Sequence, residues 1–330
     1  MERPASTAAW ASVGDDPAPK SEVKAQGVFV ELKEIVREIG RLKRERNAVI
    51  VAHNYQRPEV QDAADFVGDS LELSQKAAGW DAGVIVFCGV RFMAETAAIL
   101  APGKTVLIPD PDAGCPMADM ITAGELRSWK ARYPGRKVVC YVNTSAEVKA
   151  ESDICCTSSN AVPVVNSIPD EEVLFVPDKN LAAWTARQTG KRIIAWDGYC
   201  YVHNRFTAAD IRAAKALHPA AEVWAHPECP LEVLDLADKV ISTGKMVREA
   251  RESARTEVLV ATEAAIIHRL KKEGPTKMFY PVRGSALCFN MKKVTLDKVL
   301  MSLEDGTHRV TVPSEVADRA RGAIEKMLKI

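Results

Sequence analysis

Three stretches of the sequence carry the same landmarks in the same order, and this repetition restricts the fold more than any other feature. Each stretch holds an apolar run, an aspartate and a cysteine. The runs end at His53, Tyr141 and His226, the aspartates are Asp65, Asp153 and Asp238, and the cysteines are Cys115, Cys200 and Cys288. Every landmark recurs at intervals of 85 or 88 residues, a period longer than that of common solenoid repeats. The chain is therefore expected to contain three homologous domains.

Within each repeat, four short apolar runs alternate with alanine-rich, helix-like stretches. This pattern is typical of buried parallel strands joined by crossover helices, and it predicts α/β domains. Each domain is expected to have three layers (α/β/α), with a parallel sheet between two layers of helices. Ligands of such folds bind beyond the carboxyl ends of the strands. Around a pseudo-threefold axis, the three sets of strand ends would meet in an active site at the centre.

The repeats also set the expected domain boundaries. We expect residues 1–26 to form a disordered N-terminal extension and residues 27–123, 124–208 and 209–294 to form the three repeat domains. Residues 295–330 follow as a C-terminal extension. There Pro313 and Ser314 precede apolar residues at helical spacing, which predicts a capped amphipathic helix that packs on the core.

The charge balance and the apolar pattern exclude several kinds of partner. The 44 lysines and arginines are matched by 44 aspartates and glutamates, so no basic excess attracts nucleic acid or anionic lipid. No apolar run approaches the roughly 20 residues that cross a bilayer, and residues 1–26 lack the apolar segment of a secretion signal. Eight cysteines without dense spacing fit reduced thiols. The sequence predicts a cytoplasmic protein without nucleic-acid or membrane partners.

The three repeat-equivalent cysteines have two interpretations. Cys115, Cys200 and Cys288 lack the Cys-x-x-Cys pairs of zinc fingers and the clustered cysteines of ferredoxins. Taken singly, each is typical of a small buried residue. As equivalent positions they would bring three thiolates to one point and leave one coordination position open for a substrate. The remaining cysteines have no equivalents in the other repeats and are expected in the core: Cys88, Cys140, Cys155, Cys156 and Cys229.

Acid and base groups lie at the expected strand ends. His53 and His226 end equivalent runs, and Glu228 follows His226 by two positions. An imidazole and a carboxylate this close can exchange protons near neutral pH. Tyr55, Tyr141 and Asn143 add two phenols and an amide at the same edge, where they would alternatively cap strands or line a domain interface. His203 is equally typical of a structural histidine.

Hydroxyl groups form a third set. Ser70, Ser158 and Thr243 are expected to open the helix after the second strand of each repeat, with Ser242 beside Thr243. The N-terminus of a helix favours anions such as phosphate or carboxylate, although hydroxyls there are also ordinary N-caps. Three of them facing one axis would suit a substrate with several negative groups.

Many separate motifs in one order make the chain resemble the quinolinate synthase family from about residue 40 to residue 300. The motifs are His53–Gln56, Gly68–Ser70, Gly114–Met120, Cys156–Ala161, Gly198–His203, His226–Cys229, Ser242–Met246 and Asn290–Lys293. That family is triplicated with a central site. Residues 1–26 have no counterpart in the family core, and Cys288 lacks the neighbouring cysteines of some members.

The resemblance implies an oxygen-sensitive [4Fe-4S] cluster held by Cys115, Cys200 and Cys288, with a fourth iron that binds substrate as a Lewis acid. It implies a transferase of NAD biosynthesis. Iminoaspartate and dihydroxyacetone phosphate would condense to quinolinate with loss of phosphate and two waters, and L-aspartate oxidase would be a transient partner. At matching positions the resemblance implies proton transfer by Glu228, His226 and Tyr55. It implies substrate binding by His53, Ser70, Tyr141, Asn143, Ser158, Ser242 and Thr243.

Two other classes of function remain open at this point. An iron-sulfur electron carrier would add Cys229 to the three repeat cysteines and so close the site with four thiolates. A zinc-containing or metal-free scaffold would need only the repeats. Iron and sulfide content separates these classes from the quinolinate synthase interpretation.

Overall fold

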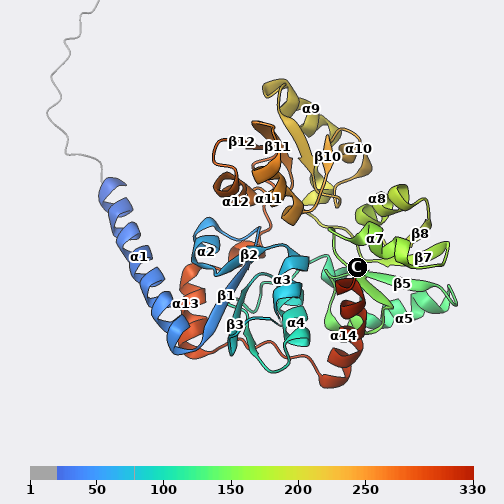
Figure 1. The fold of residues 1–330 in the computed structure, drawn as a ribbon, viewed down its shortest axis with the longest axis horizontal. Helices are drawn as coiled ribbons and strands as arrows, with labels where there is room; N and C mark the ends of the chain where they lie inside the picture. The colour runs from blue at the N-terminus through green and yellow to red at the C-terminus, as the bar shows by residue number, and fades with distance from the viewer. Residues whose placement is uncertain (1–20, 78) are drawn as a thin grey trace, which may run out of the picture.

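Three parallel sheets build the molecule, as the repeats predict. The computed structural model describes residues 21–77 and 79–330. Within this part, each sheet has four strands in the same order, with the second strand at one edge followed by the first, third and fourth: β2-β1-β3-β4, β6-β5-β7-β8 and β10-β9-β11-β12. Figure 1 shows them as three lobes. The prediction of an α/β fold with three parallel sheets flanked by helices is confirmed.

The first unit alternates strands and helices along the chain. It consists of β1 (Ala48–His53), α2 (Pro58–Ala63), β2 (Phe66–Gly68), α3 (Ser70–Ala77), β3 (Val84–Cys88), α4 (Arg91–Leu100), β4 (Thr105–Leu107) and the short 3-10 helix η1 (Ala118–Met120). It is preceded by α1 (Ser21–Glu45).

The second unit repeats this order after one additional helix. It consists of α5 (Ala123–Ala131), β5 (Lys137–Tyr141), α6 (Ala146–Ala150), β6 (Ile154–Cys156), α7 (Ala161–Ser167), β7 (Glu172–Val176), α8 (Lys179–Thr189), β8 (Arg192–Ala195) and η2 (His203–Arg205).

The third unit follows the same plan. It consists of α9 (Ala208–Leu217), β9 (Glu222–Ala225), α10 (Leu231–Leu234), β10 (Lys239–Val240), α11 (Thr243–Glu252), β11 (Glu257–Ala261), α12 (Ile266–Glu273), β12 (Met278–Pro281) and η3 (Met291–Lys293). Each 3-10 helix begins three residues after a repeat cysteine.

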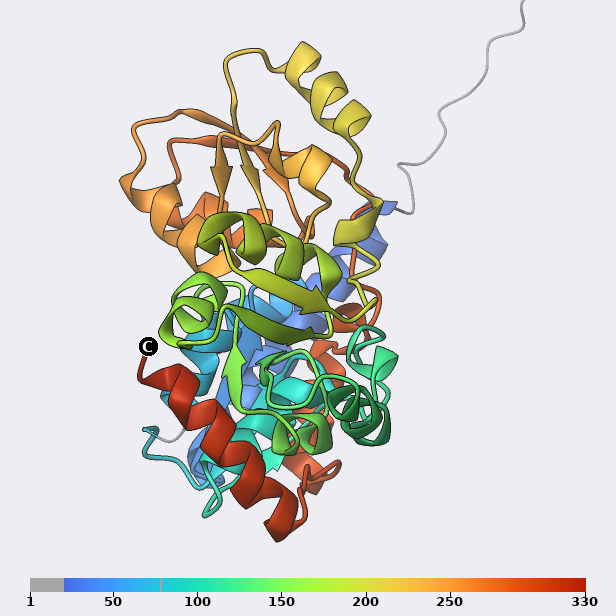
Figure 2. The same ribbon diagram turned by 90° about the vertical axis from the view of Figure 1, so that its right-hand side faces the viewer.

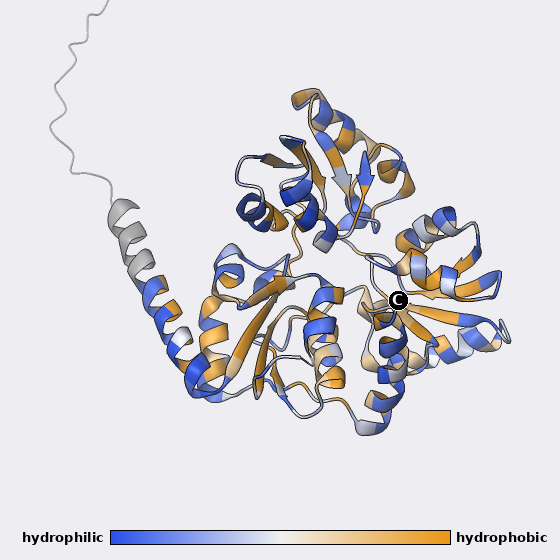
Figure 3. Ribbon diagram, in the orientation of Figure 1, coloured by the Kyte–Doolittle hydropathy of each residue, from blue (hydrophilic) through white to orange (hydrophobic). Residues whose placement is uncertain are grey.

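The central strands are apolar because helices cover both faces of each sheet. In β1, Ile50, Val51 and Ala52 are fully buried, as are Val258, Leu259 and Val260 in β11. A strand buried on both faces reads as a continuous apolar run instead of an alternating one. Figure 3 shows these strands in hydrophobic colours between helices with hydrophilic outer faces.

The three repeat aspartates, Asp65, Asp153 and Asp238, make the same hydrogen bond in their respective units. Each carboxylate accepts a hydrogen bond from a backbone N–H in the first strand of its own sheet. The donors are Ile50, Val138 and Val223, at 2.7 to 2.8 Å. Each donor lies three residues before the strand-end residue of its unit. These aspartates therefore bind the first strand away from its carboxyl end, and not at the edge where ligands bind.

The C-terminal extension packs on the first two units. It holds two helices, α13 (Leu296–Asp305) and α14 (Ser314–Leu328). The α13 helix packs against α1 and β3, and α14 packs against α6 and β6, where Figure 2 shows α14 lying along the flank of the molecule. The buried face of α14 includes Ala317, Ala320 and Ile324.

Three local expectations need correction. The α14 helix has no side-chain cap, because it begins at Ser314 and Pro313 occupies the cap position. Residues 21–26, expected in a disordered extension, form the first turns of α1, whereas residues 1–20 lie outside the described part. Ser158 does not open a helix, since α7 begins at Ala161 after a turn. The domain boundaries stay predictions. No helix of the described part is long and apolar enough to cross a membrane.

Candidate active site

The strand ends of all three units surround one central cavity. Every residue predicted for the site lines this cavity except Ser242. The lining residues from the prediction are His53, Tyr55, Ser70, Cys115, Tyr141, Asn143, Ser158, Cys200, His226, Glu228, Thr243 and Cys288. The cavity is therefore built from groups that lie more than 200 residues apart in the chain.

Each unit contributes the residue at the end of its first strand and the residue two positions later. The pairs are His53 with Tyr55, Tyr141 with Asn143, and His226 with Glu228. In the two histidine pairs the imidazole Nδ1 accepts a hydrogen bond from the backbone N–H two residues on, at 3.2 Å for Tyr55 and 3.4 Å for Glu228. This contact leaves the proton on Nε2 when the imidazole is neutral.

Burial keeps both of these histidines neutral near pH 7. It lowers the pKa of His53 to about 4 and, together with the neighbouring His203 imidazole, the pKa of His226 to about 3. The Nε2 of His226 lies 3.2 Å from the Ser158 hydroxyl. Both rings are therefore suited to donate a neutral hydrogen bond, and neither is a strong base at neutral pH.

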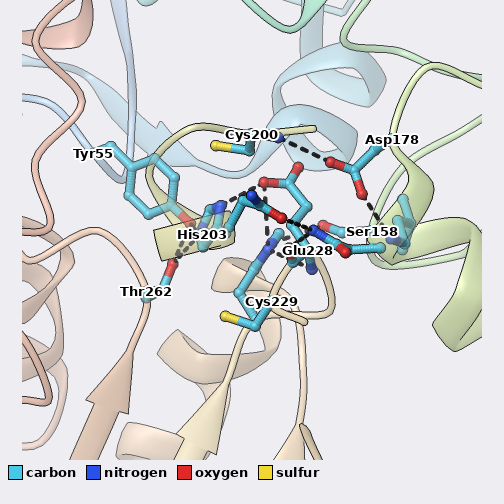
Figure 4. A network of polar contacts seen from close by, with 12 residues as sticks. Tyr55, Ser158, Asp178, Cys200, His203, Glu228, Cys229 and Thr262 are labelled. Carbon is cyan, nitrogen blue, oxygen red and sulfur yellow. Dashed lines mark hydrogen bonds and ion pairs between the residues drawn. The ribbon is translucent and has the colours of Figure 1, made fainter. Parts of the chain in front are cut away.

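A chain of polar contacts crosses all three units beside the cavity (Figure 4). The Tyr55 hydroxyl lies 2.6 Å from Thr262 Oγ1, which lies 2.7 Å from His203 Nε2. His203 Nδ1 lies 2.5 Å from Glu228 Oε2. The Tyr141 hydroxyl donates to Glu228 Oε1 at 2.5 Å. Glu228 is thus paired more closely with His203 than with its sequence neighbour His226, whose Nδ1 is 3.8 Å from the carboxylate.

Glu228 is buried yet remains ionised. Burial alone would raise the pKa of its carboxyl group, but the nearby imidazoles of His203 and His226 and the hydrogen bond from Tyr141 lower it to about 2. Burial and the Glu228 charge raise the pKa of Tyr55 and Tyr141 well above 10. At neutral pH the site therefore holds a carboxylate between protonated phenols and an imidazole.

The three repeat cysteines differ from the other five. Cys115, Cys200 and Cys288 are partly exposed and line the cavity, whereas the remaining five are buried as predicted. Burial raises the pKa of each cavity thiol, to about 12 for Cys115. A hydrogen bond from the backbone N–H of the third residue after each cysteine opposes this rise. The donors, Ala118, His203 and Met291, begin the three 3-10 helices.

Comparison with known proteins decides the family. The family described as quinolinate synthetase A protein matches residues 37–329. A quinolinate synthase from Methanoregula boonei is 57% identical over 293 residues, which cover 89% of this chain and 97% of the relative. One from Dehalococcoides mccartyi is 58% identical over 303 residues, which cover 92% of this chain and 100% of the relative.

The chain belongs to the quinolinate synthase family. Its resemblance to this family, first seen in short motifs, is therefore confirmed over most of the sequence. The match begins within α1 and ends at residue 329, just after α14. Residues 1–20 therefore lie outside both the family match and the described structure.

Two sets of side chains in this member of the quinolinate synthase family could hold a metal. Within the described residues, one group of three has ligand atoms all within 4.8 Å of one another, namely Cys200, His203 and Glu228. The three repeat cysteines are not such a group, although they are close enough for their charges to interact. A single tetrahedral zinc ion would hold three sulfur atoms about 3.8 Å apart, given a Zn–S distance of about 2.3 Å.

The hydroxyl groups divide between the cavity and a junction of the three units. Thr243 accepts a hydrogen bond from the Asn54 amide at 3.2 Å, and Ser70 and Ser158 line the cavity. Ser242 caps α11, and its hydroxyl accepts a bond from Ser159 at 2.8 Å. The expectation that Ser242 lines the cavity is therefore wrong, because the N-cap position turns its side chain toward the junction.

A carboxylate that the sequence analysis missed holds this junction together. Asp69 is buried, caps the start of α3 through the N–H groups of Leu71 and Glu72, and accepts a hydrogen bond from Ser159 at 2.8 Å. The junction thus joins Asp69, Ser159 and Ser242, one from each unit.

Four further residues of the site were missed or left undecided. Thr262 carried no signal, because a single threonine after an apolar run is ordinary, and His203 was left undecided. Asp178 and Glu263 are fully buried carboxylates, and burial raises the pKa of both. A signal for them was present, since each stands two residues after the third strand of its unit.

Proposed function

We propose that the chain catalyses the condensation of iminoaspartate with dihydroxyacetone phosphate to quinolinate, phosphate and two waters. One observation carries the proposal: the cavity holds three cysteine thiols, one from each unit, beside the chain of contacts from Tyr55 through His203 to Glu228. Removal of water needs a base at carbon and an acid at the leaving hydroxyl. Both kinds of group face this cavity.

We further propose that Cys115, Cys200 and Cys288 hold a [4Fe-4S] cluster. The thiols are too far apart as a set to share one small ion, and each receives a backbone N–H hydrogen bond of the kind that stabilises thiolates around clusters. Three protein ligands leave one iron without a cysteine, and when bound this cluster would supply a Lewis acid at that iron. The donor set therefore fits the group.

His203 is the best-placed base of the site. Its Nδ1 faces the Glu228 carboxylate and its Nε2 faces Thr262 and, at 3.4 Å, the Tyr55 hydroxyl. A carboxylate at one ring nitrogen fixes the tautomer and stabilises the imidazolium that forms when the other nitrogen takes a proton. Glu228 thus orients and stabilises His203, and Tyr55 or Thr262 passes the proton to it.

The remaining lining residues bind the charged groups of the substrates. The neutral imidazoles of His53 and His226 and the hydroxyls of Ser70, Ser158 and Thr243 offer donors to carboxylate and phosphate oxygens. Asn143 has a buried amide oxygen without a hydrogen-bond partner in the described part of the chain. A buried polar atom of this kind is costly unless a ligand or water satisfies it. Tyr141 also lines the cavity, where its hydroxyl donates to Glu228.

The position of Cys229 argues against an iron-sulfur electron carrier in which this residue would be the fourth cysteine ligand. Its thiol is fully buried, lies 3.5 Å from the Ala261 carbonyl and does not line the cavity. Figure 4 shows it on the far side of Glu228 from Cys200. A zinc scaffold has one observation in its favour, the close group of Cys200, His203 and Glu228. The metal content therefore has to be measured directly.

The test is anaerobic purification followed by metal analysis and an assay with both substrates. We expect brown protein with about four iron and four sulfide per chain, and quinolinate formation that needs both substrates. Colourless protein with one zinc per chain, or an iron-loaded protein that forms no quinolinate, would overturn the proposal. Transient contact with L-aspartate oxidase and a cytoplasmic location belong to the same proposal; a pull-down with the oxidase and cell fractionation test them.

A further inference from the structure

The loops that carry the three cysteines are held by one backbone contact that all units share. The N–H of Arg91, Lys179 and Ala264 donates in each case to the carbonyl two residues before the cysteine. The acceptors are Ala113, Gly198 and Ala286, each at 2.8 Å. This contact ties each cysteine loop to the third residue after the third strand of its own unit.

A second contact is present in two units only. Asp178 Oδ2 accepts a hydrogen bond from the Cys200 backbone N–H at 3.1 Å, as Figure 4 shows. Glu263 Oε1 accepts one from the Cys288 backbone N–H, also at 3.1 Å. Both carboxylates are 0% exposed, and both stand two residues after the third strand. The equivalent position in the first unit is Val90, whose side chain cannot accept a hydrogen bond.

The other contacts of the two carboxylates explain why they are buried. Asp178 also caps α8 by accepting from the Leu181 N–H at 2.7 Å. Glu263 pairs with the Lys292 ammonium at 2.8 Å, and this ammonium also donates to the Tyr55 carbonyl. Glu263 therefore links the Cys288 loop to the first unit, whereas Asp178 links the Cys200 loop to the start of a helix.

The first unit holds its cysteine loop from another direction. Asp110 accepts a hydrogen bond from the Asp112 N–H at 2.8 Å and lies 2.5 Å from the Lys298 ammonium of α13. Lys293 donates to the Asp112 carbonyl at 2.7 Å. These contacts hold the residues that precede Cys115, and none of them is made to the Cys115 N–H. The three cysteines thus share a backbone frame but differ in side-chain support.

We infer that Asp178 and Glu263 are positioning residues that hold the Cys200 and Cys288 loops in the geometry that retains the metal cluster. The inference rests on the proposed function in one respect, that these cysteines are cluster ligands. Groups that hydrogen-bond to the segments around metal ligands fix the direction of those ligands, and their loss costs about 10- to 100-fold in metal affinity or activity. Neither carboxylate needs to touch substrate for this role.

The test separates loop positioning from helix capping. Asp178→Ser keeps an oxygen that caps α8 but is too short to reach the Cys200 N–H. Glu263 accepts from three donors, the Cys288 N–H, the Lys292 ammonium and the Ala265 N–H, and Glu263→Gln places an amide N–H₂ group against at least one of them. Matched controls are Asp153→Asn and Asp238→Asn, which alter a carboxylate bonded to a backbone N–H in the same unit but at the amino half of the sheet. None of the four changes a cysteine.

We expect iron loss to a chelator, followed anaerobically, to be about tenfold faster in Asp178→Ser and Glu263→Gln than in the unaltered protein. The two controls should release iron at the unaltered rate after correction for any change in melting temperature. In the cluster-free protein, amide hydrogen exchange should accelerate in residues 198–201 for the first variant and in residues 286–289 for the second. This second readout does not depend on the cluster.

Each outcome has one meaning. Unaltered protein without iron and sulfide contradicts the proposed function. Unaltered protein with a full cluster, combined with unchanged iron loss and exchange in both variants, contradicts the positioning role alone. Equal acceleration in the variants and the controls would show general loosening of the fold and would also overturn the inference. If Glu263→Gln fails to fold, Asp178→Ser decides the question.

Discussion

Replacing Glu228 with Gln removes one negative charge at the centre of the polar chain and leaves the side-chain shape unchanged. The carboxylate now faces His203 at 2.5 Å and accepts from Tyr141 at 2.5 Å. An amide satisfies only one of these partners in the same way. If the amide oxygen still accepts from the Tyr141 hydroxyl, the amide N–H₂ group faces His203 Nδ1. The imidazole proton then lies on Nε2, and this nitrogen can no longer accept a hydrogen bond from Thr262 or Tyr55.

The size of the effect follows from these contacts. A hydrogen bond to a charged group contributes about 1.5 to 3 kcal/mol. The carboxylate accepts one from Tyr141 and makes a close polar contact with His203, to which we assign a similar magnitude. A loss of about 3 to 5 kcal/mol from the transition state corresponds to about 10² to 10⁴ in turnover. We expect the variant to keep its cluster and still bind quinolinate, because the three cysteines and the anion-binding hydroxyls are unchanged.

The assay is quinolinate formation under anaerobic conditions, with cluster content matched between proteins. Glu232→Gln is the matched control, since Glu232 is an exposed glutamate in α10 only four positions further along the chain, and its turnover should be unchanged. Turnover of Glu228→Gln within about threefold of the unaltered protein would refute the role given to the carboxylate. The proton transfer would then not depend on the pairing of His203 with Glu228.

Four further predictions follow from the site. Single Ala variants of Cys115, Cys200 and Cys288 should lose the cluster, whereas those of Cys88, Cys140 and Cys155 should keep it, because the latter three are buried in the core; iron analysis of all six variants decides this. Quinolinate should alter the electron paramagnetic resonance or Mössbauer spectrum of the cluster, because one iron has no cysteine; a spectrum unchanged at saturation would favour a closed site. Ser158→Ala should mainly raise KM and lower kcat by less than about tenfold, because a hydroxyl that binds an anion contributes similarly to substrate and transition state; a large fall in kcat at unchanged KM would contradict this. Burial lowers the pKa of His53 to about 4 and of His226 to about 3, from about 6.5 in the unfolded chain, so their stabilising effect is complete above pH 6.5 and is lost as the pH falls toward 4. Urea unfolding of the cluster-free protein should show a loss of about 2 kcal/mol per histidine between pH 7 and pH 5, and a His226→Gln variant should lose less; equal stability at both pH values would show that the rings are not buried in the neutral form.

Local patterns in the sequence predict the repeated fold and the edge at which the site lies. Apolar runs bounded by turns predict parallel strands, because a strand buried on both faces needs apolar residues throughout. Their regular spacing predicts three copies of one domain, and the position of His53, Tyr141 and His226 at strand ends places them at the ligand-binding edge. Each of these inferences depends on local patterns that a single domain can satisfy.

Local patterns were less reliable for the starts of helices. Ser158 precedes a helix in the sequence, yet α7 begins three residues later, at Ala161. Ser242 looks equivalent to a binding hydroxyl, yet it caps α11 and faces Ser159. A hydroxyl near a helix N-terminus can serve either role, and a shift of one residue turns its side chain away from the cavity.

The pairing of side chains in the site depends on how the three units pack in three dimensions. Glu228 follows His226 in the sequence, but its closest imidazole is that of His203, and Thr262 connects His203 to Tyr55 across the units. These contacts join residues 25 to 207 positions apart, and they depend on how three domains pack and on which rotamers that packing allows. The same holds for Asp178 and Glu263, whose bonds to the cysteine loops form only when each loop folds back over its own sheet. Residue periodicity records how one strand or helix meets its own core, whereas contacts between domains depend on a geometry that no single segment specifies.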